Sequence, residues 1–136
     1  MHRTLPALLA CTAVALLSAA RPASTHHAFA AEFDSERPIE IRGVVKKMEW
    51  INPHTWITLD VTNEDGTVDT WEIEGGAPNA LFRRGFTRDS LPVGTEIVVR
   101  GFQARAGGNR ANGRDLTLPN GERLFFSPSA PGDGAN

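Results

Sequence analysis

Apolar and polar residues alternate along most of the chain between residues 39 and 73, which is the period of a β-strand. The first alternating run begins at Ile39 and predicts a long strand that bends near Gly43, where the missing side chain allows curvature. A second run covers residues 54–61, and a third surrounds Trp71 and Ile73. The pattern therefore predicts three consecutive strands that turn their apolar faces to one core.

The turn between the second and third strands sets their register. A two-residue turn would place polar residues of one strand opposite apolar residues of the other. A three-residue loop, Glu64–Gly66, instead pairs Leu59 with Trp71 and Ile57 with Ile73, and a left-handed glycine commonly ends such a loop. We therefore predict the three-residue loop. The outward face then carries His54, Trp56, Thr58, Glu72 and Glu74.

A short helix is predicted over residues 75–85. Pro78 suits the first helical turn, and Gly85 suits the position that ends a helix. The apolar residues Leu81 and Phe82 are expected to fill the core from this helix.

The remaining pattern gives a fourth strand over residues 95–104, an open loop over 107–113, and a last hairpin with strands at 116–118 and 124–126. Three strands, a short helix and two or three further strands form the order of an OB-type barrel. The sequence therefore predicts a mostly β protein, a small OB-like barrel of five or six strands with one helix between strands three and four. An SH3-like barrel and an open β-sandwich are the alternatives.

The first 25 residues have the features of a secretory signal peptide. Arg3 precedes an apolar stretch over residues 5–20 that is too short and too broken to span a membrane. Small residues favour cleavage after Ala20, with Ala23 and Thr25 as alternative sites. We therefore expect export to the periplasm.

Length and composition fit one domain. The chain has 136 residues, and we expect a single folded domain over residues 26–126 and a disordered tail over 127–136. Loss of the signal removes Cys11, the sole cysteine, so the domain would fold without a disulfide. The net charge of −2 argues against nucleic acid as a partner, and no segment is expected to stay inserted in a membrane after processing.

Histidines are the best candidates for metal binding. His26 and His27 lie near a possible new N-terminus and His54 lies beside Trp56, and neutral imidazole is a preferred ligand of copper and zinc. Cleavage after Thr25 would let the amine and ring of His26 chelate Cu(II) with His54 as a third nitrogen. Cleavage after Ala23 would give a square-planar site at a third-position histidine, and cleavage after Ala20 gives neither. An exposed terminal pair and a histidine bonded to a carbonyl are the structural alternative.

Other residues of the outward face could also bind a ligand. Glu72 and Glu74 could complete a metal shell or pair with His54 in acid–base chemistry, and Trp56 could stack against a sugar or a peptide. An ordinary solvated sheet face is the structural alternative for the glutamates. No Ser-His-Asp, Cys-His, phosphate-loop or dinucleotide motif is present, so no catalytic residue is assigned and a binding role is favoured over an enzyme.

Two pairs of arginines are further candidates for ligand binding. Arg83 and Arg84 end the predicted helix, and Arg110 and Arg114 lie in or near the expected loop. Guanidinium groups match carboxylates and phosphates, so either pair could hold an anion. Arginines at a helix end also serve simply to complement the helix dipole.

Four motifs span nearly the whole mature chain: HHAFAAEFD at 26–34, EWINPHTW at 49–56, GAPNALFRRG at 76–85 and GNRANGR at 108–114. Together they resemble a family of small exported bacterial proteins classed as a domain of unknown function. The resemblance implies a signal peptide, one compact mostly β domain and a periplasmic setting in Gram-negative bacteria, with no activity attached. It also places the three histidines within the shared motifs.

Two functional hypotheses follow. The first is a periplasmic, non-enzymatic binding module that holds a transition metal, copper before zinc, through His26, His27 and His54. The alternative is an envelope-accessory protein that binds a peptide, a glycan or a protein partner through the Trp56 face without metal. An enzyme that uses His54 with Glu74 is a third reading.

Overall fold

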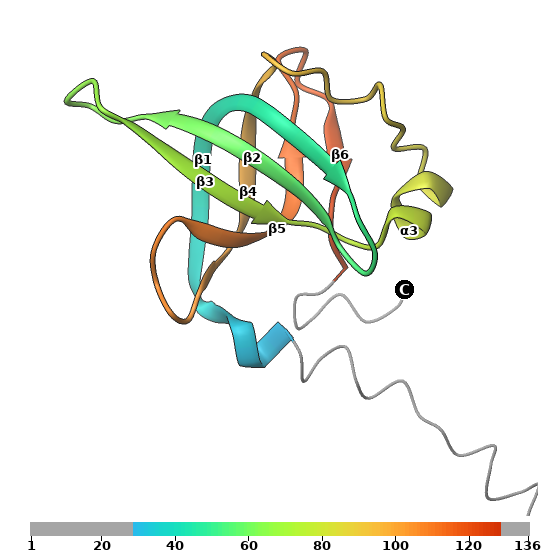
Figure 1. Cartoon of the computed structure of the whole chain (residues 1–136), viewed down its shortest axis with the longest axis horizontal. Helices are drawn as coiled ribbons and strands as arrows, with labels where there is room; N and C mark the ends of the chain where they lie inside the picture. Colours follow the sequence, from blue (N-terminus) through green and yellow to red (C-terminus); the bar gives the residue numbers. More distant parts are fainter. Residues whose placement is uncertain (1–28, 129–136) are drawn as a thin grey trace, which may run out of the picture.

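The computed structural model describes residues 29–128 of the chain. A helical turn over residues 29–32 leads into the first of six strands, and one short helix follows the third (Figure 1). The elements are β1 (Phe33–Trp50), β2 (Thr55–Thr62), β3 (Val68–Glu74), α3 (Pro78–Arg83), β4 (Glu96–Ala104), β5 (Arg110–Thr117) and β6 (Arg123–Phe125).

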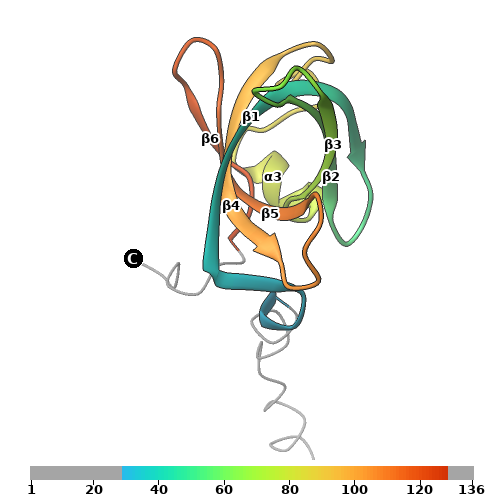
Figure 2. The same cartoon turned by 90° about the vertical axis from the view of Figure 1, so that its left-hand side faces the viewer.

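The strands form one curved sheet that closes on itself. Their order is β3-β2-β1-β4-β5-β6, and an additional pairing joins β3 to β5. This last pairing is parallel, whereas all the others are antiparallel, and it closes the first five strands into a ring (Figure 2). Three strands, a helix and three strands in a ring-like sheet confirm the predicted mostly β, OB-like architecture.

The β2–β3 hairpin has the predicted register. Leu59 pairs with Trp71, and Ile57 pairs with Ile73. Gly66 has the left-handed φ of 85° that ends a three-residue loop. The requirement that both strands turn their apolar residues to one core was therefore sufficient to set the pairing.

β1 is longer than predicted and changes its inward face partway along. It begins at Phe33 rather than Ile39 and pairs with β4 along its first part and with β2 along its second. Pairing with β2 shifts between Val45 and Lys47, which marks a β-bulge. A side chain at Gly43 would meet the carbonyl oxygen of Asp60 at 2.7 Å, so the predicted bend coincides with a close approach of β1 to β2.

The core fills the ring with side chains from every strand and from α3. Its largest fully buried apolar members are Phe126, Ile57, Leu59, Ile73, Leu81, Ile97, Leu116, Val45 and Val99. A second, smaller cluster forms outside the ring, where Phe29, Phe33 and Ala104 pack with Phe102. This second cluster attaches the N-terminal turn to the barrel.

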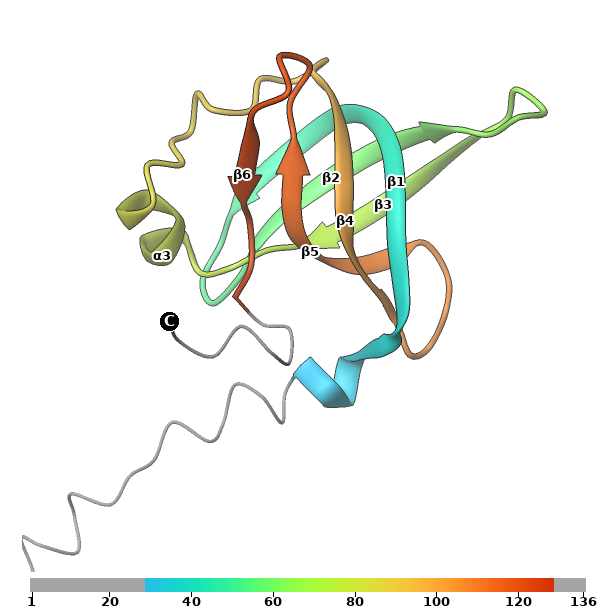
Figure 3. The same cartoon turned by 180° about the vertical axis from the view of Figure 1, so that it is seen from behind.

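Two local expectations were wrong. Phe82 does not fill the core: its ring stacks on Trp50 with 4.7 Å between centroids, because a helix of six residues buries only one side, that of Leu81. Residues 107–113 are not all loop, because β5 begins at Arg110. Its parallel pairing with β3 provides hydrogen-bond partners for the backbone N–H and C=O groups there. Figure 3 shows β5 between β4 and β6.

The C-terminal end of the described chain packs onto the barrel. Ser127 is fully buried, and its backbone N–H donates to the carbonyl of Arg114 at 3.1 Å. Residues 129–136, which make up most of the expected tail, lie outside the described residues, as do the expected signal peptide, His26 and His27.

Candidate functional site

The site lies on the outer face of the barrel, where β2, β3 and β5 adjoin. Trp56 of β2 pairs with Glu74 of β3, and Glu74 in turn pairs with Asn112 of β5. Residues paired across neighbouring strands point to the same side of a sheet. Trp56, Glu72 and Glu74 therefore share one face as predicted, and Arg110 and Asn112 join them from β5.

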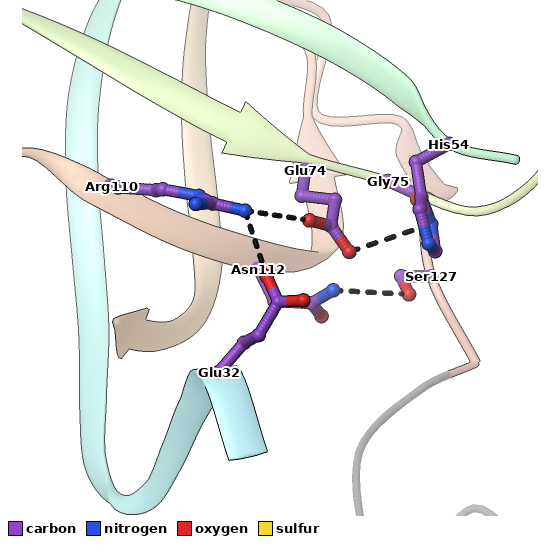
Figure 4. Close-up of polar contacts among 7 residues, drawn as sticks. All are labelled: Glu32, His54, Glu74, Gly75, Arg110, Asn112 and Ser127. Carbon is purple, nitrogen blue, oxygen red and sulfur yellow. Dashed lines mark hydrogen bonds and ion pairs between the residues drawn. The ribbon is translucent and has the colours of Figure 1, made fainter. Parts of the chain in front are cut away.

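Glu74 is the centre of a chain of polar contacts. One of its carboxylate oxygens lies 3.3 Å from Nη2 of Arg110, and the other lies 3.4 Å from Nδ1 of His54. The same Arg110 nitrogen lies 2.9 Å from a carboxylate oxygen of Glu32 in the N-terminal turn (Figure 4). We refer to Glu32, His54, Glu74 and Arg110 as the polar cluster. It joins the N-terminal turn, the residue just before β2, and the strands β3 and β5.

Burial dominates the electrostatics of Glu74. The residue is only 6% exposed, and this desolvation raises the pKa of its carboxyl above the ordinary 4.5. His54 and Arg110 act in the opposite direction, because positive charge favours the carboxylate, while the negative charge of Glu32 adds to the rise. The balance shows that the ion pair only partly offsets the cost of burying this carboxyl.

The contacts of His54 define which ring nitrogen carries a proton. Its Nδ1 lies 3.2 Å from the carbonyl oxygen of Gly75 and 3.4 Å from the Glu74 carboxylate. The Gly75 carbonyl can only accept a hydrogen bond, so Nδ1 is the donor in that bond, and in the neutral ring Nε2 then holds a lone pair. The His54 side chain is 42% exposed, so part of the ring faces solvent.

Trp56 is half-buried beneath an arginine. The guanidinium of Arg110 lies 5.0 Å from the centre of the Trp56 ring and 5.7 Å from that of Phe33, both within cation–π distance. The Trp56 ring, which was expected to offer an exposed surface for stacking, therefore has the Arg110 guanidinium against it. Arg110 thus contacts both acids and both rings around it.

Glu72 lies apart from the polar cluster. Its carboxylate accepts a hydrogen bond from the Thr58 hydroxyl at 3.2 Å, within the β2–β3 pair. It shares the outward face with Trp56 and Glu74 but contacts a different set of side chains. This makes Glu72 a useful control for experiments on Glu74.

Buried polar side chains lie beside the polar cluster. Thr55, Asn112 and Ser127 are almost completely inaccessible, and the Asn112 amide lies 3.5 Å from the Ser127 hydroxyl (Figure 4). Sequence reasoning did not assign Glu32, Asn112 or Ser127 to the site, and it treated Arg110 as part of a loop. The available signal was the alternation of small Ala111 and Gly113 with polar Arg110 and Asn112, which is a strand period without large apolar residues.

Metal coordination within the described chain is limited. Residues 29–128 contain no group of three or more His, Cys, Asp or Glu side chains arranged to hold a metal ion. His54 is the candidate ligand in this part of the chain, and the other two predicted histidines precede it.

No helix within residues 29–128 is long and apolar enough to cross a membrane. The fold and the polar cluster define a small OB-like β protein with a histidine, a buried carboxyl and an arginine on its outer face. The chain belongs to the family described as a family of unknown function (DUF6152), whose model matches residues 13–113. The resemblance to a family of unknown function is thereby confirmed. No curated protein and no solved structure matches the chain significantly.

Proposed function

We propose that the protein is an exported, non-enzymatic module that binds a transition-metal ion, copper in preference to zinc, through His54 together with His26 and His27. The observation that carries the proposal is the contact of Nδ1 of His54 with the Gly75 carbonyl, with the Glu74 carboxylate 3.4 Å away. Metal-binding histidines almost always donate the N–H of their other ring nitrogen to a carboxylate or a backbone carbonyl. The Nδ1 of His54 contacts the Gly75 carbonyl in this way and lies beside the Glu74 carboxylate, which leaves Nε2 as the ligand atom.

The rest of the polar cluster supports this role for His54. Glu74 orients the ring, and Arg110 holds Glu74 from the other side. Such outer contacts fix the direction of a ligand lone pair and raise the basicity of the imidazole. In this proposal Glu74 and Arg110 are positioning residues and do not touch the metal.

The remaining ligands would come from the chain that precedes Phe29. Phe29 packs on Phe33 and Phe102, with ring centroids 5.6 and 5.9 Å away, and neighbouring Glu32 contacts Arg110 of the polar cluster. His26 and His27 are three and two residues before Phe29, and three residues of extended chain span about 10 Å. The anchored turn therefore supports a site that these histidines share with His54.

Copper is favoured over zinc by the proposed ligand set. Imidazole nitrogens bind both ions, but affinity for nitrogen sites rises to a maximum at Cu(II) in the first-row series. Cleavage of the signal after Thr25 would add the terminal amine of His26 as a further nitrogen. Export itself is proposed from the signal-like sequence of residues 1–25.

Native mass spectrometry of protein purified after export with its own signal tests the proposal directly. With one equivalent of Cu(II), we expect a one-to-one adduct, and the mass also gives the N-terminal residue. His54→Ala should lower copper affinity at least tenfold, and Glu74→Gln about tenfold, which is the usual effect of losing an outer contact. Glu72→Gln is the matched control and should bind like the wild type. An unchanged affinity in His54→Ala would refute the proposal.

The alternative is a partner-binding module that uses the Trp56 face without metal. It gains some support from the guanidinium against the Trp56 ring, which offers a peptide or a glycan both an apolar surface and hydrogen-bond donors. If this alternative holds, Trp56→Ala abolishes capture of the partner from a periplasmic extract and a chelator has no effect.

A further inference from the structure

Three arginines at the end of α3 and just beyond it differ from most other arginines of the fold. Arg83, Arg84 and Arg88 are exposed, and within residues 29–128 no carboxylate forms an ion pair with them. Elsewhere on the barrel, arginines pair with acids: Arg42 with Glu96, Arg100 with Glu40, Arg105 with Asp34, Arg110 with Glu32 and Glu74, and Arg123 with Asp115. Within the described chain, three positive charges without an ion-pair partner are therefore concentrated in residues 83–88, next to the exposed acid Asp89.

Exposed apolar side chains adjoin these arginines. Phe82 of α3 is 43% exposed, and Ile51, which directly follows β1, is 51% exposed. The stacking of Phe82 on Trp50 brings the end of β1 against α3, and the guanidinium of Arg88 lies 5.6 Å from the same Trp50 ring. We refer to Ile51, Phe82, Arg83, Arg84 and Arg88 as the α3 patch. Figure 1 shows α3 standing out at the periphery of the barrel.

The charge of the α3 patch is informative because it is opposite in sign to the net charge of the whole chain. The net charge is −2, yet the α3 patch carries three positive charges together with two apolar side chains. Exposed arginines next to an exposed aromatic ring are the features with which proteins attach to anionic lipid surfaces: the guanidiniums attract headgroups while the apolar side chains enter the boundary with the acyl chains. Long arginine stems can also lie along the apolar layer while their charges reach the headgroups.

We propose that the α3 patch docks the protein peripherally on the surface of an anionic phospholipid bilayer. Phe82 and Arg83 lie on α3, Arg84 caps it, and Arg88 and Ile51 lie in neighbouring loops, so the patch spans several segments, which suits a broad, flat partner better than a narrow peptide. This role is independent of metal binding, because the patch shares no residue with the polar cluster.

Vesicle co-sedimentation of the exported protein in the presence of a chelator tests the proposal. We expect binding to vesicles of phosphatidylcholine mixed with phosphatidylglycerol and little binding to phosphatidylcholine alone. Each arginine near an anionic surface contributes about fivefold in affinity, so the triple variant Arg83→Gln/Arg84→Gln/Arg88→Gln should bind about a hundredfold more weakly. High salt should weaken the wild type in the same direction.

The matched control removes the same charge from another face. Arg37→Gln/Arg42→Gln/Arg100→Gln, on β1 and β4, has an identical net charge, and its binding should stay within about threefold of the wild type, because distant charges are screened by salt. If the triple variant of the α3 patch unfolds, Arg83→Gln alone should still lose about fivefold. The proposal would be overturned if the control variant lost as much vesicle affinity as the α3-patch variant, or if the wild type bound neutral vesicles equally well. It would also be overturned if the wild type bound no vesicles but captured poly-glutamate.

Discussion

The inner and outer faces of β3 are built from adjacent residues but are stabilised in opposite ways. Ile73 points into the ring among apolar side chains, whereas Glu74, one residue later, points outward and is almost as buried. Burial of Ile73 is favourable by the hydrophobic effect. Burial of Glu74 is unfavourable for its charge, as the raised pKa of its carboxyl shows. The comparison suggests that the interior provides the stability and that the polar cluster is kept for a function.

The largest expected effect tests the interior side of this comparison. Phe126 is fully buried against Phe86, and a side chain added at Gly75 or Gly113 would collide with or crowd its ring. Phe126→Ala should lower the free energy of unfolding by about 3–5 kcal/mol because it leaves a large cavity. Urea unfolding measures the change.

Phe125→Ala is the matched control for this prediction. The adjacent ring is only half-buried and lies on the outer side beneath the guanidinium of Arg84, 3.9 Å away. Its loss should cost about 1 kcal/mol, since less apolar area is exposed and no interior cavity forms. Equal losses at the two positions would show that the interior does not dominate stability.

Sequence patterns predicted the parts of the fold that are held by large apolar side chains. The β2–β3 register followed from the need to direct Ile57, Leu59, Trp71 and Ile73 to one core. By contrast, the start of β5 was missed because its interior positions are Ala111 and Gly113. A side chain at Gly113 would lie 2.7 Å from Ile73, so the close approach that closes the ring requires a residue with no hydrophobic signal.

The candidate site was only half predictable for a related reason. His54, Trp56 and Glu74 share a local strand pattern, so their common face could be derived. Arg110 reaches Glu74 across 36 residues of sequence and Glu32 reaches Arg110 across 78, and only the parallel β3–β5 pairing and the anchored N-terminal turn bring them together. Contacts of this kind depend on ring closure, which a pattern along the chain does not encode.

An intermediate effect is expected where the polar cluster is broken. Arg110→Gln would leave the buried Glu74 carboxylate without its cationic partner. We expect a loss of about 1–2 kcal/mol, less than for a fully buried pair, because the Arg110 side chain is 46% exposed and its charge is screened by solvent. Arg110→Lys should restore part of the loss. Glu32→Gln, which removes only the exposed partner, should cost less than about 0.5 kcal/mol by the same measurement.

The smallest expected effect is a pH dependence that belongs to Glu74. Because the folded state raises the pKa of this carboxyl, the native protein holds the proton more tightly than the unfolded chain. The stability that this provides is fully present below the ordinary pKa of 4.5 and is lost as the pH rises through the higher folded value. Glu74→Gln should therefore gain stability relative to the wild type as the pH rises from about 4 to 7, because the variant has no proton to lose. Urea unfolding across this range measures the difference, and Glu72→Gln controls for the loss of one negative charge from the same face. If the stability of the wild type instead rose relative to that of Glu74→Gln with increasing pH, the ion pair with Arg110 would outweigh the cost of burial. The polar cluster would then be one of the sources of stability.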